Sequence, residues 1–214
     1  MGHTQIIAKE GWNQIIIALM VFLFFYAISF LAWLFFAILL FTIFIYRNPE
    51  RILEEDDELS FVAPIDGKII DISKVNLRDG TPMLSVVIKK AIWDVGIMRA
   101  PMAMSIVEIK KRFGLFLPSH SPLFSSLDEK NTLTCKGKFA SIKMIINAGL
   151  LSQRIALFDL EGVLKAGQRF AFLNDGEVTL LLPLDARIKV SLGDEVKSGM
   201  SVLGYFAYKA KNDK

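Results

Sequence analysis

The longest hydrophobic stretch of the chain runs from Trp12 to Tyr46 and contains no charged residue, no proline and no glycine. About 18 such residues are enough to propose a membrane helix. As a single helix the stretch would be roughly 50 Å long, whereas the hydrocarbon core of a bilayer is about 30 Å thick. The pattern therefore predicts either one strongly tilted helix or a hairpin of two shorter helices that turns near Ser29, and the hairpin is favoured.

A hairpin would return Lys9, Arg47 and Arg51 to the same side of the membrane. The positive-inside rule makes this the cytoplasmic side. Trp12 and Tyr46 are expected to anchor the two ends at the interface, as aromatic residues commonly do. A cleaved signal peptide fits poorly, because the hydrophobic region is too long and no small-residue cleavage site precedes Arg47. We therefore expect a retained anchor whose partner is the phospholipid bilayer.

The composition changes abruptly after the hydrophobic stretch. Pro49 stops any helix that continues from it, and the acidic run 54–58 is typical of a solvated linker. About 150 residues remain, which is enough for one domain with its own core. The expected organisation is an N-terminal tail at 1–11, a membrane anchor at 12–46, a charged linker at 47–60 and a domain at 61–214.

Short apolar or alternating runs fill this last domain, and most are separated by Gly, Pro, Asn or Asp. These runs are 69–72, 83–88, 105–109, 139–146, 154–158, 178–182 and 187–190. Two phrases, 63–69 and 190–200, resemble the strand and turn phrases of biotinyl/lipoyl-like domains, in which glycines adopt positive φ. We predict a mainly β barrel-sandwich (biotinyl/lipoyl-like) domain behind an N-terminal membrane helix or helical hairpin.

The overall composition excludes some kinds of site. The chain has 214 residues, a formal net charge of +3 and a single cysteine, Cys135, which excludes an internal disulfide. With only His3 and His120 as imidazoles, no metal site is expected. Two basic clusters, 89–90 and 110–112, either face anionic lipid headgroups or form solvated strand faces, the simpler interpretation. No extended basic surface with interleaved aromatic residues occurs, so no nucleic acid partner is expected.

Six short phrases occur in order along the chain: Ala8–Trp12, Tyr46–Arg51, Ala63–Gly67, Trp93–Pro101, Ala148–Ile155 and Gly167–Phe170. Together they resemble the motifs of the short bacterial form of phosphatidylserine decarboxylase. The resemblance covers nearly the whole chain. It implies a role in phospholipid metabolism, at the bacterial inner membrane with the domain on the cytoplasmic face.

Members of that family convert phosphatidylserine to phosphatidylethanolamine with a pyruvoyl group. They make this group by cutting their own chain at a Gly-Ser bond, assisted by a His that an Asp orients. Aligned from 180–183, the Gly-Ser pair falls on Asp175 and Gly176, and no Gly-Ser dipeptide occurs in the sequence. Gly96 stands in place of the His, whereas the Asp is kept as Asp66. The resemblance with these departures predicts that the pyruvoyl group is absent.

Other positions that match the family suggest a lipid-binding role. Arg99 and Arg154 are candidates for binding a lipid phosphate, because a guanidinium group binds phosphate with two parallel hydrogen bonds. Ion pairing to Asp94 or Asp159 explains these arginines about as well. His120 is a candidate for contacting a headgroup, or is an ordinary loop histidine between prolines.

Three hypotheses follow. The first is a membrane-anchored homologue that is not self-processed, and that binds phospholipid such as phosphatidylserine, an active decarboxylase or a second copy of itself. The second is an active decarboxylase cut at another place, such as Gly80–Thr81. The third is an anchored lipoyl-like adaptor, in which Asp66 and Gly67 are kept only for their turn.

Overall fold

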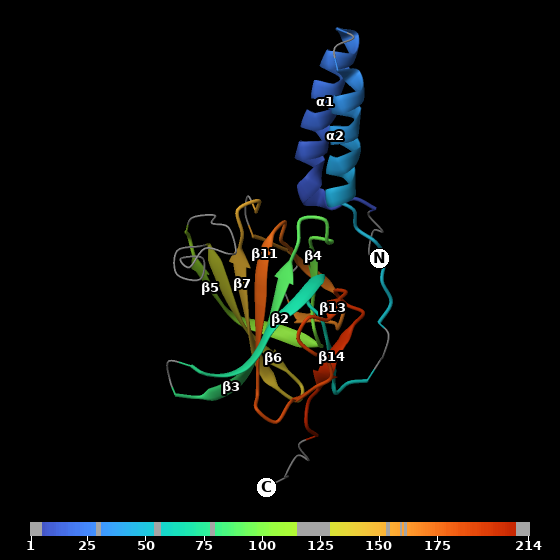
Figure 1. Cartoon of the computed structure of the whole chain (residues 1–214). Coiled ribbons are helices and arrows are strands. Elements are labelled where there is room, and N and C mark those ends of the chain that lie inside the picture. The colour runs from blue at the N-terminus through green and yellow to red at the C-terminus, as the bar shows by residue number, and fades with distance from the viewer. Residues whose placement is uncertain are drawn as a thin grey trace.

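The computed structural model describes residues 6–28, 31–53, 57–77, 80–114, 129–152, 155–158, 160 and 162–208. The hydrophobic stretch forms two antiparallel helices, α1 (Trp12–Ala27) and α2 (Ala32–Ile45), which lie side by side and project from the β domain (Figure 1). A 3-10 turn, η1 (Lys9–Gly11), precedes α1. Phe25 and Phe35 stack between the helices with ring centroids 3.9 Å apart. Of the two expected arrangements the structure has the hairpin, and residues 29–30 of its turn lie outside the described residues.

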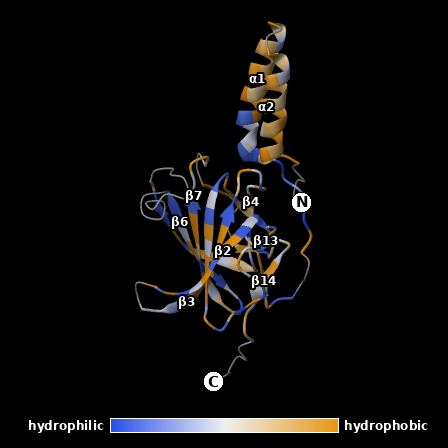
Figure 2. Cartoon of the chain, in the orientation of Figure 1, coloured by the Kyte–Doolittle hydropathy of each residue, from blue (hydrophilic) through white to orange (hydrophobic). Residues whose placement is uncertain are grey.

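The residues of the hairpin are hydrophobic over most of its length (Figure 2). Side chains such as Leu34 and Phe41 are each 52% exposed. The segment Lys9–Ala27 is long and apolar enough to cross a membrane, whereas α2 has 14 residues and is shorter. Contiguous apolar surface of this size marks a site of membrane or protein contact. These features make the hairpin a candidate membrane element.

Tyr46 was expected to anchor the hairpin at the membrane interface, but it is only 6% exposed. Its ring stacks on Phe172 of the β domain with centroids 5.6 Å apart. The Asn174 side-chain amide donates a hydrogen bond of 3.2 Å to the Tyr46 hydroxyl. Tyr46 therefore fastens the hairpin to the domain, a contact that no local sequence pattern reveals. Trp12, the other expected anchor, is 50% exposed.

The β domain is built on an eight-stranded antiparallel sheet that curls into a half-barrel (Figure 1). Its strands, in spatial order, are β13 (Glu195–Val196), β2 (Gly67–Asn76), β3 (Pro82–Lys90), β11 (Gly176–Leu182), β7 (Ser141–Ala148), β6 (Lys130–Gly137), β5 (Met104–Arg112) and β9 (Val163–Leu164). Two three-stranded sheets flank it. One has the order β1 (Ser60–Val62), β14 (Val202–Tyr205), β12 (Arg187–Ile188), and the other β4 (Ile97–Arg99), β10 (Arg169–Phe172), β8 (Ala156–Leu157). The mainly β class is confirmed, and the finer barrel-sandwich assignment stays a prediction.

Alternating sequence produces the core of this half-barrel. In β7, Ile142, Met144 and Ile146 are at most 1% exposed, and the residues between them face outward or sideways. The two lipoyl-like phrases lie against each other, because the Ile69 amide donates to the Asp194 carbonyl oxygen at 2.9 Å. In the second phrase Gly193 has a φ of 93°, as expected for a glycine in such a turn.

The segment 47–60 was expected to be a charged linker, and in the structure the charged residues at 47–51 contact the β domain. The Arg99 guanidinium donates to the Pro49 carbonyl oxygen at 3.1 Å, and Glu50 forms an ion pair of 2.6 Å with Arg169. Solvation was predicted for the acidic run 54–58 only, and these residues before it have partners far along the chain. Of the acidic run, residues 54–56 lie outside the described residues.

Candidate functional site

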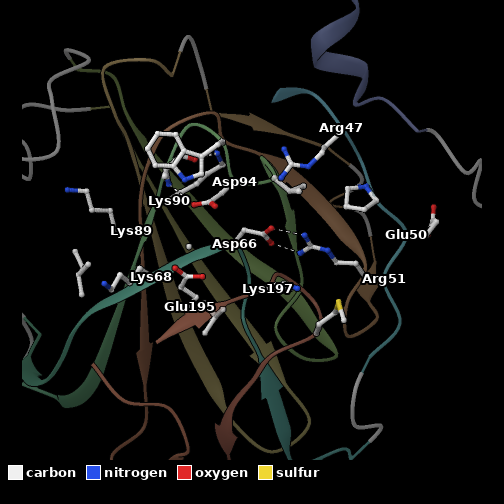
Figure 3. A pocket seen from close by; sticks show the side chains of 18 residues that line it. Arg47, Glu50, Arg51, Asp66, Lys68, Lys89, Lys90, Asp94, Glu195 and Lys197 are labelled. Carbon is white, nitrogen blue, oxygen red and sulfur yellow. Dashed lines mark hydrogen bonds and ion pairs between the residues drawn. The ribbon is translucent and has the colours of Figure 1, made fainter. Parts of the chain in front are cut away.

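A pocket of about 780 Å³ lies where the segment after α2 meets the start of β2, the end of β3 and the loop that follows β3 (Figure 3). Its charged lining residues are the basic Arg47, Arg51, Lys68, Lys89, Lys90 and Lys197 and the acidic Glu50, Asp66, Asp94 and Glu195. Basic groups thus outnumber acidic groups by six to four. The pocket therefore suits a ligand that is anionic overall and also carries a cationic group.

Asp66, which matches the Asp that orients the histidine in the family, is bound to Arg51. Arg51 Nη2 lies 2.6 Å from Asp66 Oδ2, and Nη1 bonds both to Asp66 Oδ1 and to the Ser198 carbonyl oxygen at 3.0 Å. The Ser198 amide donates to Asp66 Oδ1 at 2.8 Å. Asp66 and Arg51 have side chains only 11% and 8% exposed. This buried pair holds the segment after α2 against the turn before β14, which gives Asp66 a structural role.

Sequence reasoning placed Arg51 among the positive charges near the anchor and did not assign it to the site. Arg51 ends the phrase Tyr46–Arg51, which also contributes Arg47 and Glu50 to the pocket. The sequence feature that could have assigned Arg51 to the site is the close spacing of charged residues in this phrase. It carries three charged residues within five positions after a membrane element, and the structure places all three in one pocket (Figure 3).

Gly96, which aligns with the histidine of the family, lies in the loop between β3 and β4. A Cβ atom at this position would lie 2.7 Å from Phe172 Cε2 and 2.8 Å from the Leu173 carbonyl oxygen. Both distances are shorter than ordinary van der Waals contacts. Phe172 is held in place by its stacking on Tyr46. The aromatic pair thus fills the space that a side chain at position 96 needs.

Gly176, which aligns with the serine that becomes the pyruvoyl group, begins β11 with a φ of 140°, where other residues are strained. A Cβ atom here would overlap the Asn147 carbonyl oxygen and lie 2.9 Å from the Gly149 nitrogen. Asp175 accepts a hydrogen bond of 2.8 Å from the Gly149 amide through its own carbonyl oxygen. Position 176 therefore lacks the side-chain hydroxyl from which a pyruvoyl group is made, and the Asn147 carbonyl oxygen crowds the place where a Cβ atom would lie.

Lys90 lies directly opposite Gly176 in the register of β3 and β11 and is only 1% exposed. Its Nζ donates to the Asn174 carbonyl oxygen at 2.7 Å and to the Ala91 carbonyl oxygen at 2.8 Å. Burial lowers the pKa of Lys90 to about 8, although nearby carboxylates, Asp94 first among them, oppose this effect. The cluster 89–90 was read as facing either headgroups or solvent, but alternation along β3 turns the second lysine inward.

Of the remaining predicted site residues, the structure describes only Arg99, and Arg99 does not line the pocket. Arg99 is 6% exposed and donates to the Gly167 and Pro49 carbonyl oxygens, each at 3.1 Å. Burial lowers its pKa to about 10, which leaves it charged at neutral pH. It does not pair with Asp94, which accepts a hydrogen bond from the Ala91 amide at 2.8 Å. His120 and Arg154 lie outside the described residues.

Comparison with known sequences agrees with the motifs. A sequence model of the family described as "Phosphatidylserine decarboxylase" matches residues 38–204. A phosphatidylserine decarboxylase proenzyme of Syntrophus aciditrophicus is 33% identical over 96% of this chain and 100% of the relative. The proenzyme of Carboxydothermus hydrogenoformans is 28% identical over 95% of this chain and 98% of the relative. That of Ehrlichia chaffeensis is 32% identical over 93% and 91%, respectively.

Proposed function

The chain belongs to the phosphatidylserine decarboxylase family, and from this premise we propose that it is a membrane-anchored member that is not self-processed and binds a phospholipid headgroup. The observation that carries the proposal is Gly176. Self-processing in the family requires a side-chain hydroxyl that attacks the preceding carbonyl group. Glycine supplies no such group, and the Asn147 carbonyl oxygen occupies the space beside it.

The second missing group supports the same conclusion. A serine hydroxyl is a weak nucleophile until a base removes its proton, and His is the usual base. Position 96 carries no side chain, and Phe172 and the Leu173 carbonyl oxygen crowd it. The carboxylate of Asp66, which would orient such a base, is bound by Arg51. The pyruvoyl group is therefore absent in this proposal, and the protein acts without the chemistry of its relatives.

The pocket supports headgroup binding. Arg47 follows directly after the last residues of the apolar hairpin, at the level where lipid phosphates begin, and it lines the pocket. Lys68, Lys89 and Lys197 add positive charge for a phosphate or carboxylate, while Glu195 can accept hydrogen bonds from an amine. Phosphatidylserine carries all three groups. With basic residues at both ends of the hairpin, the positive-inside rule favours the inner membrane with the domain in the cytoplasm.

Intact mass of the protein purified from its own membrane tests whether the chain is processed. We expect one species near 24.0 kDa, the mass of the whole chain. Two fragments, the smaller beginning with a ketoacyl group, would show that an active decarboxylase is cut at another place. Release of carbon dioxide from phosphatidylserine by the purified protein alone would contradict the proposal in the same way.

Headgroup binding is tested by native mass spectrometry of the protein released from nanodiscs that contain phosphatidylserine. We expect the double variant Lys68→Gln/Lys89→Gln to bind the lipid about tenfold more weakly, because two partly exposed contacts of roughly 0.5–1 kcal/mol each are lost. Lys74→Gln is the matched control, since Lys74 is an exposed lysine on the same strand and does not line the pocket. Equal binding by all three proteins would contradict the role of Lys68 and Lys89, and no binding by the native protein would favour the adaptor hypothesis.

A further inference from the structure

One row of residues, each paired with the next across neighbouring strands, lies at the end of the large sheet where β3 and β7 end. The row comprises Lys68, Lys89, Glu177, Asn147, Lys130 and Arg112. Beyond it the chain leaves the sheet through the loop after β3 and the turn after β7, both on the side of the hairpin (Figure 1). Four of the six residues are basic, so this end of the sheet is positively charged.

The loop after β3 and the turn after β7 carry exposed apolar side chains at their tips. Trp93 is 63% exposed, Leu150 is 55% exposed and Leu151 is 51% exposed. We call these three residues the hairpin-facing rim. The rim is held in position, because the Leu151 amide donates to Asp175 Oδ2 at 3.4 Å. In the loop of Trp93, the neighbouring Val95 is only 4% exposed and packs in the cluster that joins the domain to the hairpin.

The length of the hairpin limits how far the domain can be from a bilayer. The 16 residues of α1 span about 24 Å, and the 14 residues of α2 span about 21 Å. Both are shorter than the hydrocarbon core of about 30 Å. Tyr46, directly after α2, already packs on Phe172, so no spacer separates the hairpin from the domain. A hairpin immersed over its apolar length therefore draws this end of the domain to the membrane surface.

We propose that the hairpin-facing rim inserts into the headgroup layer of the same bilayer, so that the β domain rests on the membrane surface. This inference depends on the membrane anchoring proposed above and adds a second contact to it. Tryptophan favours the headgroup level, where its ring is in apolar surroundings and its N–H group is hydrated. The basic row directly behind the rim faces anionic headgroups. Because Trp93 also lines the pocket, the pocket then opens at the level of the lipid phosphates.

Depth-dependent fluorescence quenching tests the rim. The chain has three tryptophans, so the full-length variant Trp12→Phe/Trp33→Phe leaves Trp93 as the only reporter. It is reconstituted in vesicles of three parts phosphatidylcholine to one part phosphatidylglycerol, with bromine near the start or the end of the acyl chains. We expect blue-shifted emission that shallow bromines quench about twofold or more, and deep bromines less, as for an interfacial indole. Adding Leu150→Asp and Leu151→Asp, both at exposed positions, reduces this quenching.

Two control proteins distinguish contact by the rim from insertion of the hairpin alone. In the background Trp12→Phe/Trp93→Phe, Trp33 reports whether the hairpin itself is in the bilayer. In a background without the three native tryptophans, Leu184→Trp reports the opposite end of the sheet, where Leu182 pairs with Leu84. Quenching of Trp33 and Trp93 but not of position 184 supports the proposal. Quenching of Trp33 alone overturns the rim contact and leaves the anchor intact, whereas no quenching at any position overturns both.

Discussion

A serine introduced at position 176 tests whether the surrounding backbone leaves room for a side chain there. At a φ of 140° any residue with a Cβ atom is strained, at a typical cost of about 1–3 kcal/mol. The Cβ atom of the serine would also overlap the Asn147 carbonyl oxygen. Relieving such overpacking typically costs about 1–3 kcal/mol more. We expect Gly176→Ser to lower the free energy of unfolding by about 2–6 kcal/mol and to leave the chain uncut.

The assay is denaturant unfolding in detergent micelles, followed by denaturing electrophoresis of the same samples. Gly80→Ser is the matched control, because Gly80 also has a positive φ, of 80°, but nothing lies within 4 Å of a Cβ built on it. It should cost only the conformational strain of about 1–2 kcal/mol. The difference between the two variants therefore measures the clash. The reasoning fails if Gly176→Ser is as stable as Gly80→Ser, or if Gly176→Ser combined with Gly96→His splits into two fragments.

Three further predictions concern buried charged or reactive groups. Because Lys90 has a pKa of about 8 when folded and 10.5 as its ordinary value, the folded state binds fewer protons between these values, and stability rises with pH. Relative to Lys90→Met, the unfolding free energy of the native protein should gain about 3 kcal/mol from pH 7.5 to 10.5 in denaturant titrations; a constant difference would contradict this. Burial raises the pKa of Cys135 to about 12 and shields its thiol, so iodoacetamide should label it only in molecules that have unfolded, and fast labelling of the folded protein would argue against this burial. Arg51→Met should cost about 3–5 kcal/mol in unfolding free energy, because it leaves Asp66 as a buried unpaired charge. Arg51→Met/Asp66→Leu should recover part of that loss, and equal losses would show that the ion pair is unimportant.

The alternation of apolar and polar residues predicted many of the strands, because in these strands the local sequence pattern agrees with the packing in the folded sheet. The alternating run 139–146 appears as β7 at Ser141–Ala148, where every second side chain enters the core. Strand β6 (Lys130–Gly137) was missed, since its inward positions are Asn131, Leu133 and Cys135, and one polar residue breaks the apolar pattern. Asn131 is nevertheless only 2% exposed. Its burial depends on neighbouring strands that are distant in sequence, which a local pattern does not contain.

The site was predictable at the level of residue type and unpredictable at the level of contacts. The sequence showed that positions 96 and 176 lack the groups used for processing. It did not show that Phe172 and the Asn147 carbonyl oxygen fill the corresponding spaces, since both lie on other strands. Similarly, Asp66 was identified but its partner Arg51 was not, because the pairing depends on how residues 47–53 dock on the domain.

The contacts around Gly96 and Gly176 connect the two positions through one segment of the chain. The segment 172–176 is held by the hairpin at one end, through the stacking of Phe172 on Tyr46, and by the turn after β7 at the other, through Asp175. A side chain at position 96 must displace Phe172, and with it the contact that fastens the hairpin to the domain. A cut between residues 175 and 176, where the family resemblance would place it, would release one side of this segment. In this structure the same segment joins the hairpin to the sheet, which is consistent with the proposal that the chain is not self-processed.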